Sequence, residues 1–515
     1  MPLFDDFSRG IPGGSNRGAL LGTAGWSASA PLWQPGMMFV GLDDDGNEVG
    51  HIDDRHIVTV AGSRGGKGVS CIVPNLRRWP GSCMVLDPKG ENATLTATIR
   101  AAMPGHQVAV IDPAGVANVP DHLRASFNPL DLIDAAADDA IDIAAAIGDA
   151  LMIDGGDKDV HWTESARFLI ESLILYVAIN ETGTFRSLVR VRQLLTKGEP
   201  ERAAFLNDME AETHGEKARQ FSPFDALWDS MSRIQCANEA IADIIVGAAN
   251  SVRDMGENER GSVLSTARRN TKFIDSPWMR RALQGGQYAP LDIDQLKASD
   301  GGLSIYLCLP ARFLPTHARL LRLATNLILF RMEAQGLEQP RCGHPVLMVL
   351  DEFAAIGRLE SIEKAAGLMA GFGVKLWTIL QDLGQLKRHY KESWETFLGN
   401  AGLLQFFANS DMTTLEWLSK RLGQVEVMRE TQGSSDATTT GTSKSQSMTK
   451  QSGWTRSSGT TEGQQSMAEL SRRATQDGGS GLVPFLARAN ASDVSHSQGR
   501  SAQEGQYASG EDRGY

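Results

Sequence analysis

A glycine-rich stretch that contains one lysine is the part of this sequence best suited to phosphate chemistry. It covers residues 61–70, follows the β-branched run 57–60 and leads into a segment that can continue as a helix. Glycines allow successive backbone N–H groups to turn toward a phosphate, and a helix N-terminus adds positive potential. Lys67 would then reach the β- and γ-phosphates of a nucleoside triphosphate. We therefore predict a nucleotide-binding loop between a strand and a helix.

Two positions of this loop depart from the usual pattern. Its first position is Ala61 rather than glycine, and Gly68 stands where a serine or threonine normally holds Mg²⁺. Ser70 is a candidate for the missing hydroxyl. A glycine-rich turn without a ligand is the alternative, and a second motif far along the chain argues against it. The residues predicted to bind the nucleotide are Gly62, Ser63, Arg64, Gly65, Gly66, Lys67, Gly68 and Val69.

That second motif is an apolar run, residues 345–350, followed by two adjacent acids. Such a run is typical of a buried parallel strand, and ligands of open α/β sheets bind at the carboxyl ends of the strands. Asp351 can hold Mg²⁺ directly or through water, and Glu352 can orient and deprotonate an attacking water. Taken alone, the motif is equally consistent with a strand that ends at a solvated acidic turn. Together with Lys67 it predicts a hydrolytic site.

A further strand is expected at residues 374–380 and ends at Gln381. A glutamine beside the acidic strand can contact the γ-phosphate or the attacking water, although glutamines often end strands without any such role. The residues predicted to be catalytic are Lys67, Asp351, Glu352 and Gln381, with Asp351 also the predicted ligand of Mg²⁺.

Composition restricts the possible classes of function. The chain has 515 residues, 41% of them hydrophobic, and a formal net charge of −12, so any contact with DNA must be local. Five scattered cysteines argue against a zinc site or a disulfide framework and indicate a reducing compartment. The uncharged residues 19–42 contain prolines and glycines and make a poor membrane span. We expect a cytoplasmic protein with no transmembrane helix and no secretory signal.

The order of apolar runs predicts an α/β fold that a helical domain interrupts. Helical spacing without strands prevails from residue 138 to 283, which is the size of a domain rather than a loop. Strands of a parallel sheet are expected at residues 57–60, 83–86, 107–111, 304–310, 345–350, 374–380 and 403–407. The predicted division is an irregular segment 1–55 with one hairpin near Asp45-Gly46, a nucleotide-binding domain 56–135 and 290–425, an all-α insertion 136–289, and a low-complexity, disordered tail 426–515.

Several short motifs in this order resemble those of the TraG family of type IV secretion and conjugative coupling proteins, over about residues 56–423. They are Gly66-Lys67-Gly68, Asp87-Pro88-Lys89-Gly90-Glu91, Phe127-Asn128-Pro129-Leu130, Leu350-Asp351-Glu352-Phe353, Gly357-Arg358-Leu359 and Leu380-Gln381-Asp382-Leu383. In that family a glycine commonly follows the lysine, as Gly68 does here. The resemblance implies a RecA-like P-loop NTPase with a parallel sheet, an inserted all-α domain, and ATP and Mg²⁺ as cofactors.

The resemblance also implies a function. A coupling protein hydrolyses ATP to recruit and translocate single-stranded DNA, with its relaxase, or protein substrates to a secretion channel. Its partners would be single-stranded DNA, a relaxase, the type IV secretion machinery and further copies of the chain in a hexamer, at the cytoplasmic face of the inner membrane. The alternative is an ATPase motor for protein substrates or plasmid maintenance that pumps no DNA. The sequence leaves both open.

Two basic clusters are candidates for contact with DNA. One is residues 387–391, where Tyr390 could stack on a base, and the other comprises Arg268, Arg269 and Lys272 on one predicted helix. A solvated helix face is the alternative for each. Arg358 is the first candidate for an arginine finger, with a surface arginine as the alternative.

Overall fold

The computed structural model describes residues 31–152, 160–215, 218–422, 424–432 and 458–466. The chain divides into two compact units, and the larger one contains the described residues up to 418. Among the described helices, none has both the length and the apolar character of a membrane span.

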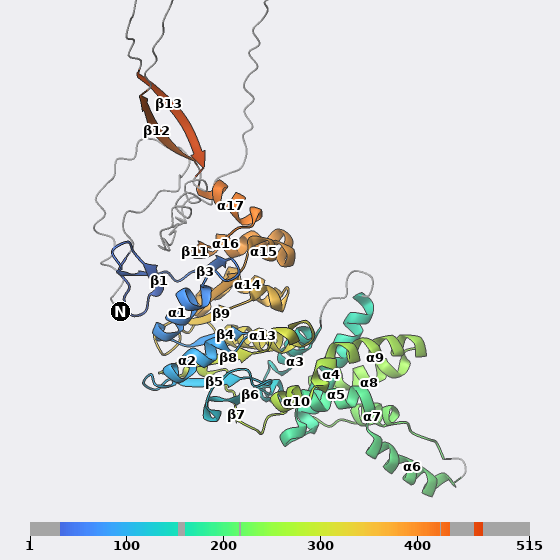
Figure 1. Cartoon of the computed structure of the whole chain (residues 1–515). Helices are drawn as coiled ribbons and strands as arrows, with labels where there is room; N and C mark the ends of the chain where they lie inside the picture. Colours follow the sequence, from blue (N-terminus) through green and yellow to red (C-terminus); the bar gives the residue numbers. More distant parts are fainter. Residues whose placement is uncertain (1–30, 153–159, 216–217, 423, 433–457, 467–515) are drawn as a thin grey trace, which may run out of the picture. The chain divides into compact units, whose positions relative to one another are not determined.

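A seven-stranded parallel sheet forms the centre of the larger unit (Figure 1). The strand order is β11-β3-β10-β9-β4-β8-β5, and every neighbouring pair runs in parallel. The strands are β3 (His56–Ala61), β4 (Cys83–Asp87), β5 (Gln107–Ile111), β8 (Leu303–Cys308), β9 (Val346–Leu350), β10 (Val374–Leu380) and β11 (Ala401–Phe407). They are continuous apolar runs because both faces of the sheet are covered. The predicted parallel sheet is confirmed, with a strand at each predicted run.

Alternate side chains of these strands pack into two separate hydrophobic cores, one on each face of the sheet. On one face, Val85 and Trp377 pack with the short helices α1 and α2 and the hairpin β1–β2. On the other, Met84 and Leu376 pack with α13, α14 and the helical insertion. The elements are β1 (Met38–Leu42), β2 (Glu48–His51), α1 (Val73–Arg78), α2 (Glu91–Ala101), α13 (Arg319–Ala334) and α14 (Glu360–Leu368). Successive side chains of a strand point to opposite faces, so each strand packs against helices on both sides of the sheet.

The hairpin β1–β2 is the one regular element in the described part of the segment predicted to be irregular. Its turn lies at the predicted place, because Gly46 has φ 82° and its N–H donates to Asp43 O at 3.0 Å. Asp43 Oδ1 also accepts from the backbone N–H of Asn47 at 2.7 Å. Residues 1–30 of that segment lie outside the described residues.

Helices fill the region between β5 and β8, as the spacing predicted (Figure 1). They are α3 (Ala140–Leu151), α4 (Val160–Asn180), α5 (Leu188–Lys197), α6 (Pro200–His214), α7 (Pro223–Ser232), α8 (Glu239–Asp254), α9 (Glu257–Thr271) and α10 (Pro277–Gln284). Two short strands, β6 (Ala125–Ser126) and β7 (Ala289–Pro290), pair in parallel where the chain enters and leaves this region. The exact domain boundaries stay a prediction.

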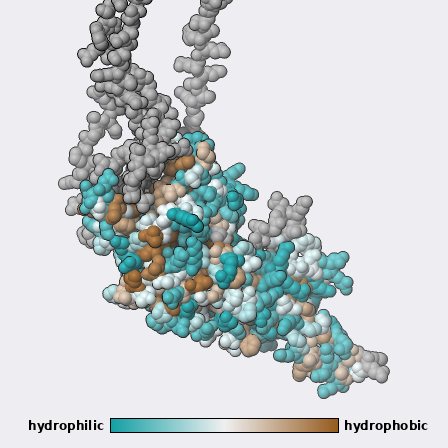
Figure 2. Space-filling view, viewed as in Figure 1, coloured by the Kyte–Doolittle hydropathy of each residue, from teal (hydrophilic) through white to brown (hydrophobic). Residues whose placement is uncertain are grey.

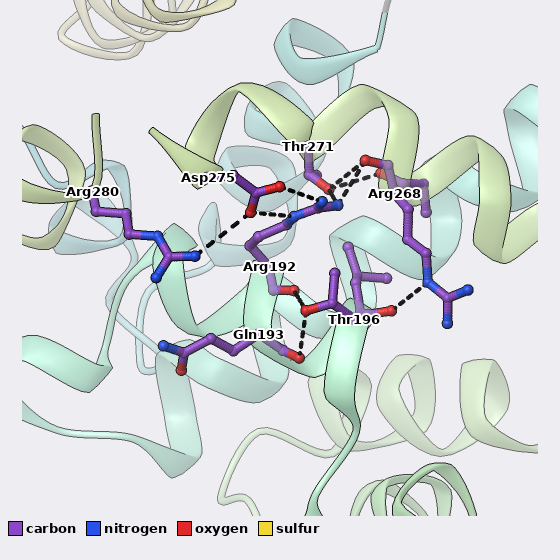
Figure 3. Close-up of polar contacts among 9 residues, drawn as sticks. Arg192, Gln193, Thr196, Arg268, Thr271, Asp275 and Arg280 are labelled. Carbon is purple, nitrogen blue, oxygen red and sulfur yellow. Dashed lines mark hydrogen bonds and ion pairs between the residues drawn. The ribbon is translucent and has the colours of Figure 1, made fainter. Parts of the chain in front are cut away.

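A buried arginine connects two elements of the insertion (Figure 3). Arg192 of α5 donates to both carboxylate oxygens of Asp275 at 3.0 and 2.7 Å, and to Arg268 O at 2.7 Å. It also donates to Thr271 Oγ1 at 3.1 Å. A buried guanidinium needs such partners, so these bonds fix α5 against the end of α9.

The second compact unit contains two strands in the predicted disordered tail. β12 (Gln424–Gln432) and β13 (Ser458–Ser466) pair antiparallel, with Gln424 opposite Ser466. The expectation of no regular structure is therefore wrong for these two stretches. Both contain β-branched valine or threonine residues, which favour strands even in a polar sequence. Residues 433–457 and 467–515 of the predicted tail lie outside the described residues.

Candidate functional site

The strand order brings the predicted catalytic residues to one place. β10 lies between β3 and β9, so the chain leaves these three parallel strands at neighbouring points of the same sheet edge. Lys67 follows β3, Asp351 and Glu352 follow β9, and Gln381 follows β10. This is the carboxyl edge, where open α/β sheets bind their ligands.

The four side chains form one connected cluster. Lys67 Nζ lies 2.9 Å from Asp351 Oδ1 and 3.2 Å from Glu352 Oε1. Gln381 Nε2 donates to Glu352 Oε2 at 3.1 Å. The charged side chains retain between 16% and 26% of their exposure, so water screens them less than it would a surface pair.

The charge state of Lys67 follows from this cluster. Burial is the largest influence on its pKa and acts to lower it. Asp351 and Glu352 act in the opposite direction, and the net result is a pKa above the ordinary value for lysine. Lys67 therefore remains cationic at neutral pH, which suits an anionic ligand.

The phosphate loop adopts backbone conformations that require glycine at two positions. Gly66 has φ 86°, and a Cβ placed on Gly62 would lie 2.1 Å from the backbone oxygen of Ala408. Arg64 has φ 60°, which is strained for a residue with a side chain. Strained conformations of this kind cluster at ligand-binding sites. A π-helical turn (η1, Gly68–Ile72) follows and continues into α1.

Other residues of the predicted loop differ in exposure. Ser63 and Arg64 are exposed, and Val69 retains 77% of its exposure. Ser70, the candidate for the missing hydroxyl, donates to Gly66 O at 2.9 Å. This bond uses the hydroxyl hydrogen, and Cys71 Sγ lies 3.6 Å from the same oxygen, so one lone pair remains available.

Asn409 was not predicted as a site residue, although the strand before it was. The loop after β11 lies against the phosphate loop, since Gly62 N donates to Phe407 O at 3.4 Å. The side-chain oxygen and nitrogen of Asn409 are both shielded from solvent, and neither has a hydrogen-bond partner among the described residues. A buried amide without partners costs free energy and requires an explanation. The strand order places β11 beside β3, and this alone positions Asn409 next to the phosphate loop.

The predicted stacking of Tyr390 on a DNA base is wrong. Tyr390 ends α15 (Leu383–Tyr390) and is only 3% exposed. Its ring stacks on Phe353 at 5.5 Å between centroids and meets Phe397 edge-on at 4.7 Å. The ring belongs to the core beneath the turn that follows Glu352. The basic residues of this cluster, Lys387, Arg388 and Lys391, are exposed.

The second predicted basic cluster is in part structural. Arg268 donates to Leu195 O at 2.7 Å. Its guanidinium also lies 5.3 Å from the ring centre of Phe224. Lys272 starts a separate 3₁₀ turn after α9. The prediction that Arg268, Arg269 and Lys272 lie on one helix is therefore wrong. Arg358, the candidate finger, is half exposed and pairs with Glu363 at 3.1 Å. Its role stays a prediction.

Comparison with known proteins assigns the family. The family described as type IV secretory system conjugative DNA transfer matches residues 26–453. The chain belongs to this family. The conjugal transfer protein TraG of Escherichia coli is 29% identical over 405 residues, which are 75% of this chain and 58% of that protein. The protein VirD4 of Rhizobium radiobacter is 25% identical over 374 residues, 72% of this chain and 48% of that protein. The chain therefore spans about half the length of these two relatives.

Solved structures of one conjugative protein share the fold. The unbound monoclinic form of the coupling protein TrwBdeltaN70 matches 88% of this chain and 87% of its own with a TM-score of 0.55 and 15% sequence identity. TrwB in complex with ADP and Mg²⁺ matches 76% of this chain and 79% of its own, with a TM-score of 0.51 and 16% identity. The predicted RecA-like P-loop NTPase fold is confirmed by this likeness and by the parallel sheet.

Proposed function

We propose that this chain is the ATP-hydrolysing motor of a coupling protein that recruits and translocates single-stranded DNA, with its relaxase, or protein substrates to a type IV secretion channel. The observation that carries the proposal is the connected cluster of Lys67, Asp351, Glu352 and Gln381 beside the glycine-rich loop. Membership of the conjugative DNA transfer family supports it.

ATP and Mg²⁺ suit the residues of this site. The backbone of residues 62–69 and the ammonium of Lys67 would hold the phosphates. Asp351 would hold Mg²⁺ directly or through water, since Mg²⁺ in phosphate sites takes one or two carboxylates and retains several waters. Bound Mg²⁺ neutralises charge on the phosphate oxygens. TrwB structures with ADPNP and with ADP and Mg²⁺ support this assignment.

Glu352 is the proposed general base. Its Oε1 faces Lys67 and its Oε2 accepts from Gln381, so both oxygens are held in place. When Lys67 exchanges this carboxylate for phosphate, Oε1 becomes free to orient a water and to accept its proton. Gln381 would keep the carboxylate aligned during this exchange.

Exposed basic residues follow directly from the catalytic strand β10. Lys387 and Arg388 lie on α15 and Lys391 just after it. Gln385 of α15 accepts from the backbone N–H of Gln381 at 3.1 Å, which connects this helix to the catalytic edge. We propose that these three cations contact the phosphates of the DNA strand, because the chain as a whole is acidic and must concentrate positive charge locally.

Assembly into a ring is a further part of the proposal. α2 exposes Leu95 and Ile99 one turn apart, at 52% and 38% of their full exposure. Figure 2 shows hydrophobic surface near α1 and α2 and a mainly hydrophilic helical insertion. Exposed apolar surface of this kind commonly marks a protein contact, and a neighbouring subunit would cover it.

The deciding experiment measures ATPase turnover with and without single-stranded DNA, under conditions where the protein oligomerises. We expect stimulation in the wild type and in the matched control Lys364→Gln. Neutralising Lys387, Arg388 and Lys391 together should abolish the stimulation, keep basal turnover, and flatten the salt dependence of DNA binding by about 0.7 in slope per lost contact. Turnover without DNA binding or stimulation in the wild type would instead favour the motor for protein substrates.

A further inference from the structure

The turn that carries Glu352 is held in a strained conformation. Glu352 has φ 54° and ψ 41°, the left-handed region that side chains rarely occupy. A 3₁₀ turn (η8, Phe353–Ile356) follows, and Gly357 then takes φ 71°. Strain of this kind persists only where the surroundings enforce it. The residues that enforce it here therefore determine where the proposed base lies.

Two side chains from distant parts of the chain bind this turn. The hydroxyl oxygen of Tyr390 accepts from the backbone N–H of Leu359 at 3.4 Å, and its ring stacks on Phe353. Arg322 of α13 donates through one nitrogen to Ile356 O at 3.1 Å and to Arg358 O at 2.6 Å. Hydrogen bonds from a charged donor are stronger than neutral ones, so the bonds from Arg322 stabilise the turn more than the bond to Tyr390 does.

The same helix is bonded to the helical insertion on both sides of Arg322. One turn earlier, Arg319 donates to Leu151 O at 3.1 Å and to Asn270 Oδ1 at 2.9 Å. One turn later, Asn326 donates to Ala146 O at 2.9 Å. Positions 319, 322 and 326 share one face of a helix, so a single rigid element contacts the Glu352 turn, the second half of α3 and the end of α9.

We propose that Arg322 is a positioning residue for Glu352 and that α13 connects the state of the catalytic turn to the helical insertion. This rests on the proposed function, in which Lys67 leaves Glu352 when a nucleotide binds. A shift of the turn would move the two carbonyl groups that Arg322 holds. Because Arg319 and Arg322 are on one helix, occupancy of the site would then change the contacts of the insertion, although none of the insertion's described residues belongs to the site cluster.

The positioning role predicts a change in turnover rather than in binding. Arg322→Ala should lower kcat by about 10- to 100-fold, the cost of a small misplacement of a catalytic group, and should leave the Kd of ADPNP within about twofold. Arg322→Lys keeps a charged donor and should recover part of the loss. The matched control is Arg331→Ala on the same helix, which breaks an ion pair to Asp294 of 2.8 Å and should affect Tm but not kcat.

The connection predicts a response at a distance. Amide hydrogen exchange at the end of α9, residues 266–271, should change when ADPNP binds the full chain. Arg319→Ala and Arg322→Ala should each abolish this change, and only Arg322→Ala should reduce kcat. An unchanged kcat in Arg322→Ala, or a fall equal to that of Arg331→Ala, overturns the positioning role. A wild type that binds ADPNP without a response in α9 overturns the connection, whereas a wild type that binds no nucleotide overturns the proposed function itself.

Discussion

The carboxyl edge of the sheet has two halves, and acids follow the strands in both. After β9, Asp351 and Glu352 are partly exposed and face the ammonium of Lys67. Asp87 ends β4 and Asp112 follows β5, and both side chains are buried and accept from backbone N–H groups. The first pair has polar atoms directed into the site, whereas the second pair stabilises the turns that follow its own strands.

The difference lies in what satisfies each carboxylate. Asp87 Oδ2 accepts from the backbone N–H of Ala93 at 2.8 Å. Asp112 accepts from two backbone N–H groups at 3.0 and 2.8 Å, and its Oδ2 lies 3.2 Å from the guanidinium of Arg124. A carboxylate with such partners caps a turn, whereas one whose main partner is a lysine can exchange it for a ligand. The position of an acid at a strand end therefore does not identify its role.

The sharpest test of this comparison is Glu352→Gln. The variant keeps the size of the side chain and its contact with Gln381, but it removes the proposed proton acceptor. We expect kcat to fall by about 10²- to 10⁴-fold while nucleotide binding persists, measured by steady-state turnover and by ADPNP titration. An equal loss of binding would place Glu352 in the nucleotide pocket rather than at the water.

Lys67→Ala tests the other member of the cluster. Loss of its charge-assisted contacts, each worth roughly 1.5–3 kcal/mol, should weaken ATP binding by about 100-fold. Removing the lysine also leaves two carboxylates facing each other, which adds repulsion to the missing attraction. Fluorescent ATP titration measures the effect, and binding within threefold of the wild type would contradict the role of the loop.

In the buried half of the edge, Asp87 should make the stability of the folded chain depend on pH. Burial raises the pKa of Asp87 from 3.8 to about 6, so the folded chain retains a proton that the unfolded chain releases in this interval. The free energy of unfolding should therefore decrease as pH rises from about 4 to 6, by roughly 3 kcal/mol at most. Asp87→Asn should remove this decrease and stabilise the protein at pH 7.

Urea unfolding at several pH values compares Asp87→Asn with the wild type. Asp112→Asn is the matched variant and should destabilise, because it removes the buried ion-pair partner of Arg124 and leaves only the exposed Asp121 at 3.4 Å. Parallel stability curves for the wild type and Asp87→Asn would show that Asp87 titrates as an ordinary surface acid.

The smallest effect is expected at Asn409. We propose that its unsatisfied amide contacts bound nucleotide, so Asn409→Ala should weaken ADPNP binding by a few fold, the worth of about one neutral hydrogen bond. The same change should leave Tm unchanged or higher, since it removes a buried polar group that lacks a partner in the described residues. A lower Tm with unchanged binding would assign Asn409 a structural role.

Most of the sheet could be predicted because its strands are continuous apolar runs, and the runs that end at Gln381 and Asp351 mark the site directly. Parallel strands place their ends together whatever their separation along the chain, which is why Lys67 and Glu352 could be paired in advance. Arg322 and Asn409 could not be found in this way. Their proposed roles depend on contacts between elements that no local pattern encodes.

Tyr390 shows the opposite error. An aromatic residue within a basic run is a reasonable candidate for stacking on a base, but α15 is amphipathic and buries the face that carries this ring. Helical spacing separates Tyr390 from Arg388, which is exposed, and places it with Leu383 and Leu386, which are buried. The spacing of the leucines along α15 thus already indicates a buried ring.

The strand order also has a consequence for synthesis on the ribosome. The first three strands of the sheet to be translated, β3, β4 and β5, are never neighbours: each pairs only with strands made after the insertion. Between Ile111 and Leu303 lie residues 112–302, which take roughly 10–40 s to translate at about 5–20 residues per second. Throughout that time the nascent chain holds three apolar strands with unpaired edges, a state prone to aggregation. Chaperone dependence during expression should therefore fall in a circular permutant that begins at β8, so that the early strands emerge when their partners are already present.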